Sequence, residues 1–446
     1  MIARRDIVTE TSKFTTTKVE KINRRTLLKV AGSAGLAVAS NVPLVNIAGA
    51  ASTTIKIGWV GCLSGVRAAF AEPDPWVHER MKALVKDGLK IGGKNYAVEF
   101  VIKDDQSDPN RASVVASELV LREKCDLILA EDGDAEIPLG ELADARGIPT
   151  ISTMVPWQGW MFPRKSTPDK GFPYTFHFFW GADDVVKNYI GMWQSVETNK
   201  KVGTLYIDNP PGKAFSDPKT GLPAGIKQAG YQEISTGSFQ IATDDFSNQV
   251  STFKNAGVDI VSGFTYGNHW VTLWNQAAQA GFRPNVCTVA AAFLFPSAVN
   301  ALGDRGDGMS TEVWWTPAYP FKSSLTGQSA KELAAEWEKT TGKQWTQPIG
   351  YAHALWEVGF AALRNSDPKD KNSLRDAIAG LDLETVVGPV KFKGSPIKNV
   401  AVTALSGGQW RKTKGGKYPY ELLIVHNGTA PFIPKQADLV LLSKLA

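Results

Sequence analysis

The sequence predicts an α/β protein of two lobes, each with a parallel-core sheet of the Rossmann-like kind, joined by a three-crossing hinge. Three observations predict this fold. Strand and helix patterns alternate up to about residue 151, the alternation stops in a Pro-, Gly- and Trp-rich stretch at 154–180, and it then restarts. Alternating βαβ units build parallel sheets that helices cover on both faces. The 446 residues are enough for two such cores.

The first series of elements opens with a short apolar strand that ends in the loop 61–65. Further along, Asp108 is expected to cap a helix that begins at Pro109, because Asp is favoured at the N-cap and Pro in the first turn. The expected elements are strands at 55–60, 96–103, 127–130 and 149–151, and helices at 74–87, 109–124 and 137–145.

The second series repeats the alternation of strands and helices, but the helices that follow it have no third sheet to cover. We therefore expect the chain to cross back, so that these late helices pack on the first lobe. The expected strands are 201–207, 231–235, 259–263, 286–290, 311–316 and 420–425, and the expected helices are 185–196, 222–229, 246–256, 269–280, 329–341, 350–363 and 373–379.

This topology defines the expected domains. One lobe comprises 51–176 with 317–386, and the other comprises 177–316 with 387–446. Between them the chain crosses near 172–180, 311–317 and 385–389, and such crossings act as a hinge. Ligands of open parallel sheets bind beyond the carboxyl ends of the strands, so the expected site is the cleft between the lobes.

Residues 1–50 are expected to be an export leader. Arg24-Arg25 stands in a stretch that resembles a twin-arginine signal, a mildly apolar run follows at 30–39, and Ala48-Gly49-Ala50 is a small-residue cleavage signal. The run is shorter than the ~20 residues of a membrane span. We expect cleavage near Ala50 and a periplasmic protein.

Charge and cysteine content exclude several classes of protein. The first 50 residues hold eight basic and three acidic side chains, so they carry the whole net charge of +5. The remainder is neutral, which disfavours nucleic-acid binding. Cys62, Cys125 and Cys287 fit no metal-site spacing, and their odd number leaves at least one thiol free within a monomer.

The motifs of common enzymes are missing from the sequence. His78-Glu79 is followed by Lys82 where a zinc protease needs a second His, and Ser64 lacks the preceding Gly of a nucleophile elbow. Neither a P-loop nor a dinucleotide fingerprint occurs. We therefore expect a protein that is not an enzyme and that has no cofactor and no metal site.

The chain resembles the Leu/Ile/Val-binding branch of the type I periplasmic binding proteins of ABC importers. The resemblance covers nearly the whole chain after residue 50 and follows the family order of landmarks. Those landmarks are 55–65 (IKIGWVGCLSG), 103–109 (KDDQSDP), 143–149 (ADARGIP), 276–282 (QAAQAGF) and 385–389 (TVVGP).

The resemblance implies a set of ligand-binding residues. In the family, loops after the third and fourth strands of the first lobe offer hydroxyl and N–H donors, while the second lobe offers a Tyr and an acid that holds the ligand's amino group. The corresponding positions here are Asp132, Gly133, Asp134, Ala135, Thr153, Met154, Pro156, Trp157, Tyr266 and Ala290.

Three of these positions depart from the family pattern. Gly133 stands where a Ser hydroxyl is expected, Pro156 replaces a Thr and lacks an N–H, and Ala290 lacks the carboxylate. A buried amino acid needs partners for both of its charges. We therefore expect a ligand other than Leu, Ile or Val. Ser107 and Asp132 also replace a family pair of cysteines, so that disulfide is not expected.

Aromatic and acidic side chains near the expected cleft leave two kinds of ligand open. Aromatic walls alone favour an aromatic or other carboxylate, with Arg67 in reach of the charge. Aromatic walls with Asp132 or Asp134 favour an amine or a quaternary ammonium ion. We favour the carboxylate. The aromatic residues are Trp157, Trp160, Phe178, Phe179, Trp180, Trp270, Trp314 and Trp315.

The expected partners follow from the resemblance. They are a small-molecule solute and the membrane permease and ATPase of an ABC importer, with the protein itself monomeric. The alternative is a periplasmic receptor that presents the same ligand to a signalling partner.

Overall fold

The computed structural model describes residues 54–131 and 135–445. The expected leader, its twin arginines and the cleavage point near Ala50 lie outside the described residues, as do Asp132, Gly133 and Asp134. Within the described part of the chain, which belongs to the compact unit Ala51–Ala446, no helix is long and apolar enough to cross a membrane.

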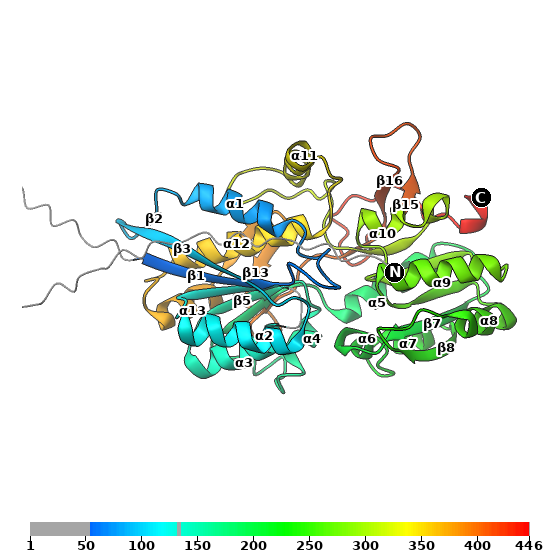
Figure 1. The fold of residues 1–446 in the computed structure, drawn as a ribbon, viewed down its shortest axis with the longest axis horizontal. Coiled ribbons are helices and arrows are strands. Elements are labelled where there is room, and N and C mark those ends of the chain that lie inside the picture. The colour runs from blue at the N-terminus through cyan, green and yellow to red at the C-terminus, as the bar shows by residue number, and fades with distance from the viewer. Residues whose placement is uncertain (1–53, 132–134, 446) are drawn as a thin grey trace, which may run out of the picture. The chain divides into compact units, whose positions relative to one another are not determined.

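The first sheet has seven strands in the order β14-β6-β5-β4-β1-β3-β2 (Figure 1). All of its neighbours are parallel except β2 and β3, which form an antiparallel pair. Its strands are β1 (Thr54–Gly61), β2 (Leu89–Ile91), β3 (Lys94–Asp104), β4 (Leu127–Glu131), β5 (Thr150–Thr153), β6 (Thr175–Phe178) and β14 (Val400–Ala401).

Helices cover both faces of this sheet. On one side α2 and α3 pack together, and α3 contacts β5 and β6. On the other side α12 (Pro348–Arg364) contacts β4 and β5 and is buried along almost its whole length, because its sequence is mostly apolar around the helix. Besides α12, the α-helices of this lobe are α1 (Asp74–Leu84), α2 (Pro109–Ser117), α3 (Glu136–Arg146), α4 (Trp157–Met161), α11 (Ala330–Thr341) and α13 (Lys371–Ala379).

The second sheet also has seven strands, in the order β16-β15-β11-β10-β9-β7-β8. Strands β15 and β16 are antiparallel additions to a parallel core. The strands are β7 (Lys201–Ile207), β8 (Gln232–Phe239), β9 (Ile260–Phe264), β10 (Val286–Ala290), β11 (Ser310–Val313), β15 (Ser406–Lys412) and β16 (Tyr420–His426).

Six helices accompany the second sheet. The longest two, α5 and α9, each have a buried apolar face, and α5 contacts β11, β15 and β16. The helices are α5 (Ala182–Gln194), α6 (Pro210–Phe215), α7 (Leu222–Gln228), α8 (Ser247–Ala256), α9 (Gly267–Gln279) and α10 (Pro296–Asn300).

The late helices cover the first sheet, as the sequence predicted. The chain leaves the first sheet after β6, returns after β11 and leaves it again after β14, so the three expected crossings exist. The third crossing, however, differs from its expected place. Residues 385–389 form the turn of the hairpin β12 (Asp382–Thr385) and β13 (Gly388–Lys391), whereas β14 still pairs with β6. The chain enters the second sheet at Ser406 rather than at residue 387.

Candidate functional site

The carboxyl ends of the parallel strands in the two sheets carry loops that touch each other. Phe70 lies in the loop between β1 and α1, and Phe295 lies in the loop that follows β10. Their ring centroids are 4.9 Å apart with planes at 82°, a favourable edge-to-face contact. The structure therefore brings together the two edges at which parallel sheets bind ligands.

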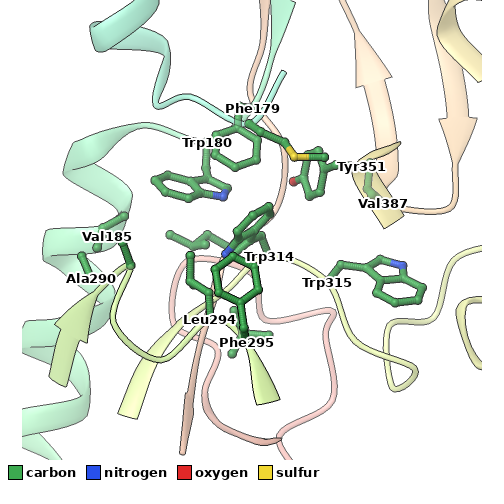
Figure 2. Packing of buried hydrophobic residues seen from close by; sticks show 14 of the residues in the cluster. Phe179, Trp180, Val185, Ala290, Leu294, Phe295, Trp314, Trp315, Tyr351 and Val387 are labelled. Carbon is green, nitrogen blue, oxygen red and sulfur yellow. The ribbon is translucent and has the colours of Figure 1, made fainter. Parts of the chain in front are cut away.

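Beside this contact lies a group of aromatic rings, which we call the crossing cluster. It consists of the buried Phe179, Trp180, Trp314 and Tyr351 (Figure 2) and of the half-buried Phe70. Trp314, just past β11, is its centre. Its ring lies 5.3 Å from that of Phe179, 6.5 Å from that of Trp180 and 5.7 Å from that of Tyr351. Phe70 stacks on Trp314 at 6.3 Å with an interplanar angle of 24°.

Tyr351 of α12 touches all three crossings. Its ring contacts Phe179 after β6 and Trp314 after β11, and its hydroxyl lies 2.7 Å from Oγ1 of Thr403, which follows β14. The side chain of Gln347, which precedes α12, accepts from the backbone N–H of Trp314 at 2.8 Å and donates to the Glu312 carbonyl at 3.2 Å. The start of α12 thus holds the crossing strands by both rings and hydrogen bonds.

A buried carboxylate lies close to the end of β10. Glu312, on the neighbouring strand β11, accepts from Tyr189 and from the Thr311 hydroxyl at 2.8 Å, and its second oxygen accepts from the Ala291 N–H at 3.3 Å. Burial raises the pKa of Glu312, because desolvation disfavours the charged form, although these donors oppose the shift. Donors of the second lobe therefore satisfy most of the hydrogen-bonding capacity of the Glu312 carboxylate.

The first lobe holds a pair of buried acids. Glu131 ends β4 and accepts from the Trp59 indole N–H at 2.8 Å, and Asp74 begins α1 with its side chain fully buried. Burial, followed by the nearby charge of Glu131, raises the pKa of Asp74 well above its usual range. Asp74 is thus held toward its neutral, protonated form.

Backbone strain occurs at matching places in the two lobes. Met154, directly after β5, has φ +67°, and Ala291, directly after β10, has φ +62°. Residues other than Gly adopt this region rarely and at a cost of about 1–3 kcal/mol, which the surrounding structure must offset. Both residues are buried at the carboxyl edge of their sheet, where strained residues are often functional.

The comparison with known families gives one match over most of the chain. A family model described as periplasmic binding protein matches residues 54–417. The chain belongs to this family. The family consists of binding proteins rather than enzymes, in agreement with the sequence analysis, and it is a family of periplasmic proteins.

Relatives and solved structures agree with this assignment. The leucine-, isoleucine-, valine-, threonine- and alanine-binding protein of Pseudomonas aeruginosa is 26% identical over 58% of this chain and 66% of its own length. A Leu/Ile/Val-binding protein homologue of Brucella abortus matches over 53% of its own length, so the chain spans less than two thirds of these curated relatives.

Two solved structures share the fold over more than four fifths of this chain. One is the branched-chain amino acid transporter substrate-binding protein of Streptococcus pneumoniae with isoleucine, at TM-score 0.65 and 20% identity, covering 83% of this chain and 100% of that one. The other is a solute-binding protein of an ABC transporter from Rhodopseudomonas palustris with 3,4-dihydroxybenzoic acid, at TM-score 0.65 and 21% identity, covering 87% and 98%.

Of the predicted first-lobe residues, those that the structure describes lie around the ends of β4 and β5. Ala135 is buried at the start of α3, and the buried Thr153 donates to the Phe178 carbonyl at 2.7 Å, which ties β5 to the first crossing. Pro156 and Trp157 are half-buried, and the backbone N–H of Trp157 donates to the Trp180 carbonyl at 3.2 Å. A ligand contact for these residues stays a prediction.

The predicted second-lobe residues lie at the ends of β9 and β10. Tyr266 is half-buried, and its hydroxyl accepts from the Asn209 side chain at 3.1 Å. Ala290 is buried and ends β10, as the sequence predicted. Both positions therefore lie at the carboxyl edge of the second sheet, although no contact with a ligand is established for them.

The predicted aromatic residues divide between the cluster and the lobe cores. Phe179, Trp180 and Trp314 belong to the crossing cluster, whereas Trp270 packs on Trp274 and Phe293 inside the second lobe. The ring of Trp315 contacts Trp345, and its indole N–H donates to the Val386 carbonyl at 3.2 Å.

Sequence reasoning missed Phe70, Phe295, Tyr351 and Glu312. Three of them lie in a loop or inside a mainly apolar helix, where nothing marks one aromatic residue above another. Glu312 did leave a signal, because it is a single acid within the apolar strand 311–316. A charge at such a place indicates a buried polar network or a site.

Proposed function

We propose that this protein is the solute-binding component of an ABC importer, which binds a small organic solute between its two lobes and delivers it to a permease and its ATPase. Membership of the periplasmic binding protein family supports the transport role. The leader at residues 1–50 supports export, with cleavage near Ala50.

The ligand that we propose is an aromatic carboxylate. The observation that carries this proposal is the crossing cluster, in which Phe179, Trp180 and Trp314 gather where the two sheets meet. Flat apolar ligands stack well on such rings. Ala290 offers no carboxylate for an amino group, and Glu312 already accepts three hydrogen bonds from its own lobe. One structural neighbour holds a dihydroxybenzoic acid.

The proposed mechanism is closure of the hinge. The crossings after β6, β11 and β14 converge on Tyr351, so rotation of one lobe against the other must move the rings of the crossing cluster. A solute that touches loops of both lobes makes its full set of contacts in the closed state alone. It therefore shifts the population toward that state, in proportion to its differential affinity.

A thermal-shift screen of purified, refolded protein tests the ligand class. Benzoate and 4-hydroxybenzoate are expected to raise the melting temperature, because a ligand at ~100 times its dissociation constant stabilises the fold by about 2.7 kcal/mol. Leucine is the matched control, since it carries a carboxylate without an aromatic ring, and it should leave the melting temperature unchanged. A rise with leucine but not with benzoate would contradict the proposal.

A cationic ligand is the second candidate, and one observation favours it. Asp74 and Glu131 are buried together at the carboxyl edge of the first sheet, where the positive charge of an amine or quaternary ammonium ion would favour the ionised form of both acids. Choline in the same screen separates the two candidates. A rise with choline alone would replace the aromatic carboxylate with a cation.

A further inference from the structure

Two buried indole N–H groups in the crossing cluster lack a hydrogen-bond partner. Trp180 is 5% exposed and Trp314 is 1% exposed, and among the described residues neither Nε1 atom has an acceptor. Their rings lie 6.5 Å apart with planes at 69°. Figure 2 shows the indole of Trp180 above that of Trp314.

Among the described residues, four buried tryptophans lack an indole partner, whereas six have one. The indole N–H groups of these six donate to an acceptor, for example Trp59 to Glu131, Trp193 to Thr288 and Trp410 to the Phe293 carbonyl. An unsatisfied buried donor costs about 1–3 kcal/mol. A pair of such donors that lie side by side at a ligand-binding edge therefore points to an acceptor that the solute brings.

Two further tryptophans also lack an acceptor among the described residues, but their surroundings differ. Trp270 is enclosed in the second lobe by Trp274 and Phe293, and Trp356 is enclosed in the first lobe by His78, Phe100 and Phe360. Neither lies on a crossing. They serve as matched controls, because each is a buried indole with the same missing partner away from the cluster.

Rings suited to the flat part of a solute surround the two donors. Phe70 stacks on Trp314 with planes at 24° and meets Phe295 edge-on, so it holds a position that an aryl ring could take over. Phe70 is half-buried and lies in the loop between β1 and α1, which leaves it freer to move than the fully buried rings of the cluster.

We propose that Trp180 and Trp314 donate their indole N–H groups to the carboxylate of the bound aromatic solute, whose ring stacks on Trp314 in place of Phe70. This inference rests on the proposed function and adds the residues that recognise the charged group. A carboxylate is the acceptor that suits two neighbouring buried N–H donors best, because hydrogen bonds to a charged partner are about twice as strong as neutral ones. The two donors come from the first and second crossings, so binding would link the crossings at the hinge.

Isothermal titration with benzoate tests the inference in Trp180→Phe and Trp314→Phe. Each change removes the N–H and keeps an aromatic ring. Loss of one hydrogen bond to a charged group predicts a dissociation constant about ten- to hundredfold higher in each variant. Trp270→Phe and Trp356→Phe should bind as the wild type does. An unchanged dissociation constant in both cluster variants, with binding intact in the wild type, would overturn this inference and leave the proposed function standing.

A matched pair of solutes separates the N–H groups from the lost ring area. Benzamide has the shape of benzoate without its charge, so lost packing weakens both solutes equally, whereas lost donors weaken benzoate more. The ratio of the affinity for benzoate to the affinity for benzamide should fall in Trp180→Phe and Trp314→Phe. It should stay unchanged in Trp270→Phe and Trp356→Phe. An unchanged ratio would assign the effect to packing and overturn the inference.

The indole resonances give a readout that needs no variant to bind. In a proton–nitrogen spectrum of the wild type, the Trp180 and Trp314 indole signals, assigned from the two variants, should move on addition of benzoate, while the Trp270 signal stays in place. Movement of neither cluster signal in a saturated wild type would contradict the inference. A wild type that binds no aromatic carboxylate at all would overturn the proposed ligand class, and the inference with it.

Discussion

Glu357 of α12 is a fully buried acid whose contacts lie away from the crossing cluster. It accepts from the backbone and side chain of Ser324, at 2.8 and 2.7 Å, and from the Val386 N–H at 3.3 Å. Burial raises the pKa of Glu357 to about 7 from 4.5, because the donors only partly offset desolvation. The facing His353, 3.5 Å away, stays neutral, since burial lowers its pKa to about 3.

This raised pKa predicts how stability depends on pH. Below pH 4.5 the carboxyl is protonated in both the folded and unfolded states, and its contribution to stability is fully present. As pH rises toward 7, the unfolded state ionises first and the contribution is lost. A tenfold change in proton affinity corresponds to about 1.4 kcal/mol, so the free energy of unfolding should fall by about 3 kcal/mol on account of Glu357.

Denaturant unfolding at pH 4.5 and pH 7.5 checks this prediction in Glu357→Gln. The variant has no charge to bury, so its free energy of unfolding should fall less between the two pH values than that of the wild type. Glu384→Gln, at an exposed position of β12, is the control and should keep the wild-type fall. Equal falls in both variants would show that Glu357 titrates normally.

Individual residues also show why the candidate site could be predicted only in part. Ala290 and Tyr266 were placed correctly at strand ends, because the end of an apolar run can be read from the sequence. Glu312 could not be placed beside Ala291, since the two come from neighbouring strands and meet by sheet pairing alone. The same limit applies to Phe70 and Phe295, which meet across the two lobes.

At the scale of elements, helix α12 is the part of the first lobe that the crossings depend on. Its early residue Gly350 faces Trp315 of the second crossing so closely that an added Cβ would lie 2.3 Å from the Trp315 ring. Gly is usually unfavourable in a helix by about 1 kcal/mol relative to Ala. Its presence here is explained by the close approach of the indole.

Gly350→Ala is therefore expected to destabilise the protein, although it improves helix propensity. Overpacking a buried contact costs about 1–3 kcal/mol, which should exceed that gain. Gly359→Ala in the same helix is the matched control, because its Cβ would meet Leu129 at 3.2 Å, a contact that small shifts can relieve. Guanidinium unfolding should show a loss for the first variant and little change for the second. A stabilised Gly350→Ala would contradict the close packing.

Elements with strong apolar runs were predicted well, and weak ones were not. The runs at 55–60, 127–130 and 286–290 became β1, β4 and β10. By contrast β15 has the sequence SGGQWRK, whose glycines and polar residues carry no strand pattern, and β14 is only two residues long. Because the prediction missed these two strands, it placed the third crossing at 385–389, around the turn of a hairpin. The predicted path of the chain between the lobes differs from the structure at this crossing.

At the scale of the whole molecule, the contact between Phe70 and Phe295 joins loops that belong to different sheets. A loss of this contact should leave each core intact, since Phe70 is only half-buried and lies outside the strands and helices. It should weaken the hold of one lobe on the other in the protein without solute. The equilibrium between closed and open states would then move toward open, by the free energy that the ring contacts contribute.

Distance measurements between two spin labels test this in Phe70→Ala. Asn110→Cys on α2 and Ser251→Cys on α8 give one exposed attachment point in each lobe, and the native cysteines are all buried. Edge-to-face rings contribute about 0.5–1.5 kcal/mol, so the open fraction without solute should rise severalfold and the mean distance should lengthen. Phe162→Ala, at an exposed position of the first lobe, should leave the distances unchanged. Identical distributions in Phe70→Ala and the wild type would mean that the lobes are held by the crossings alone.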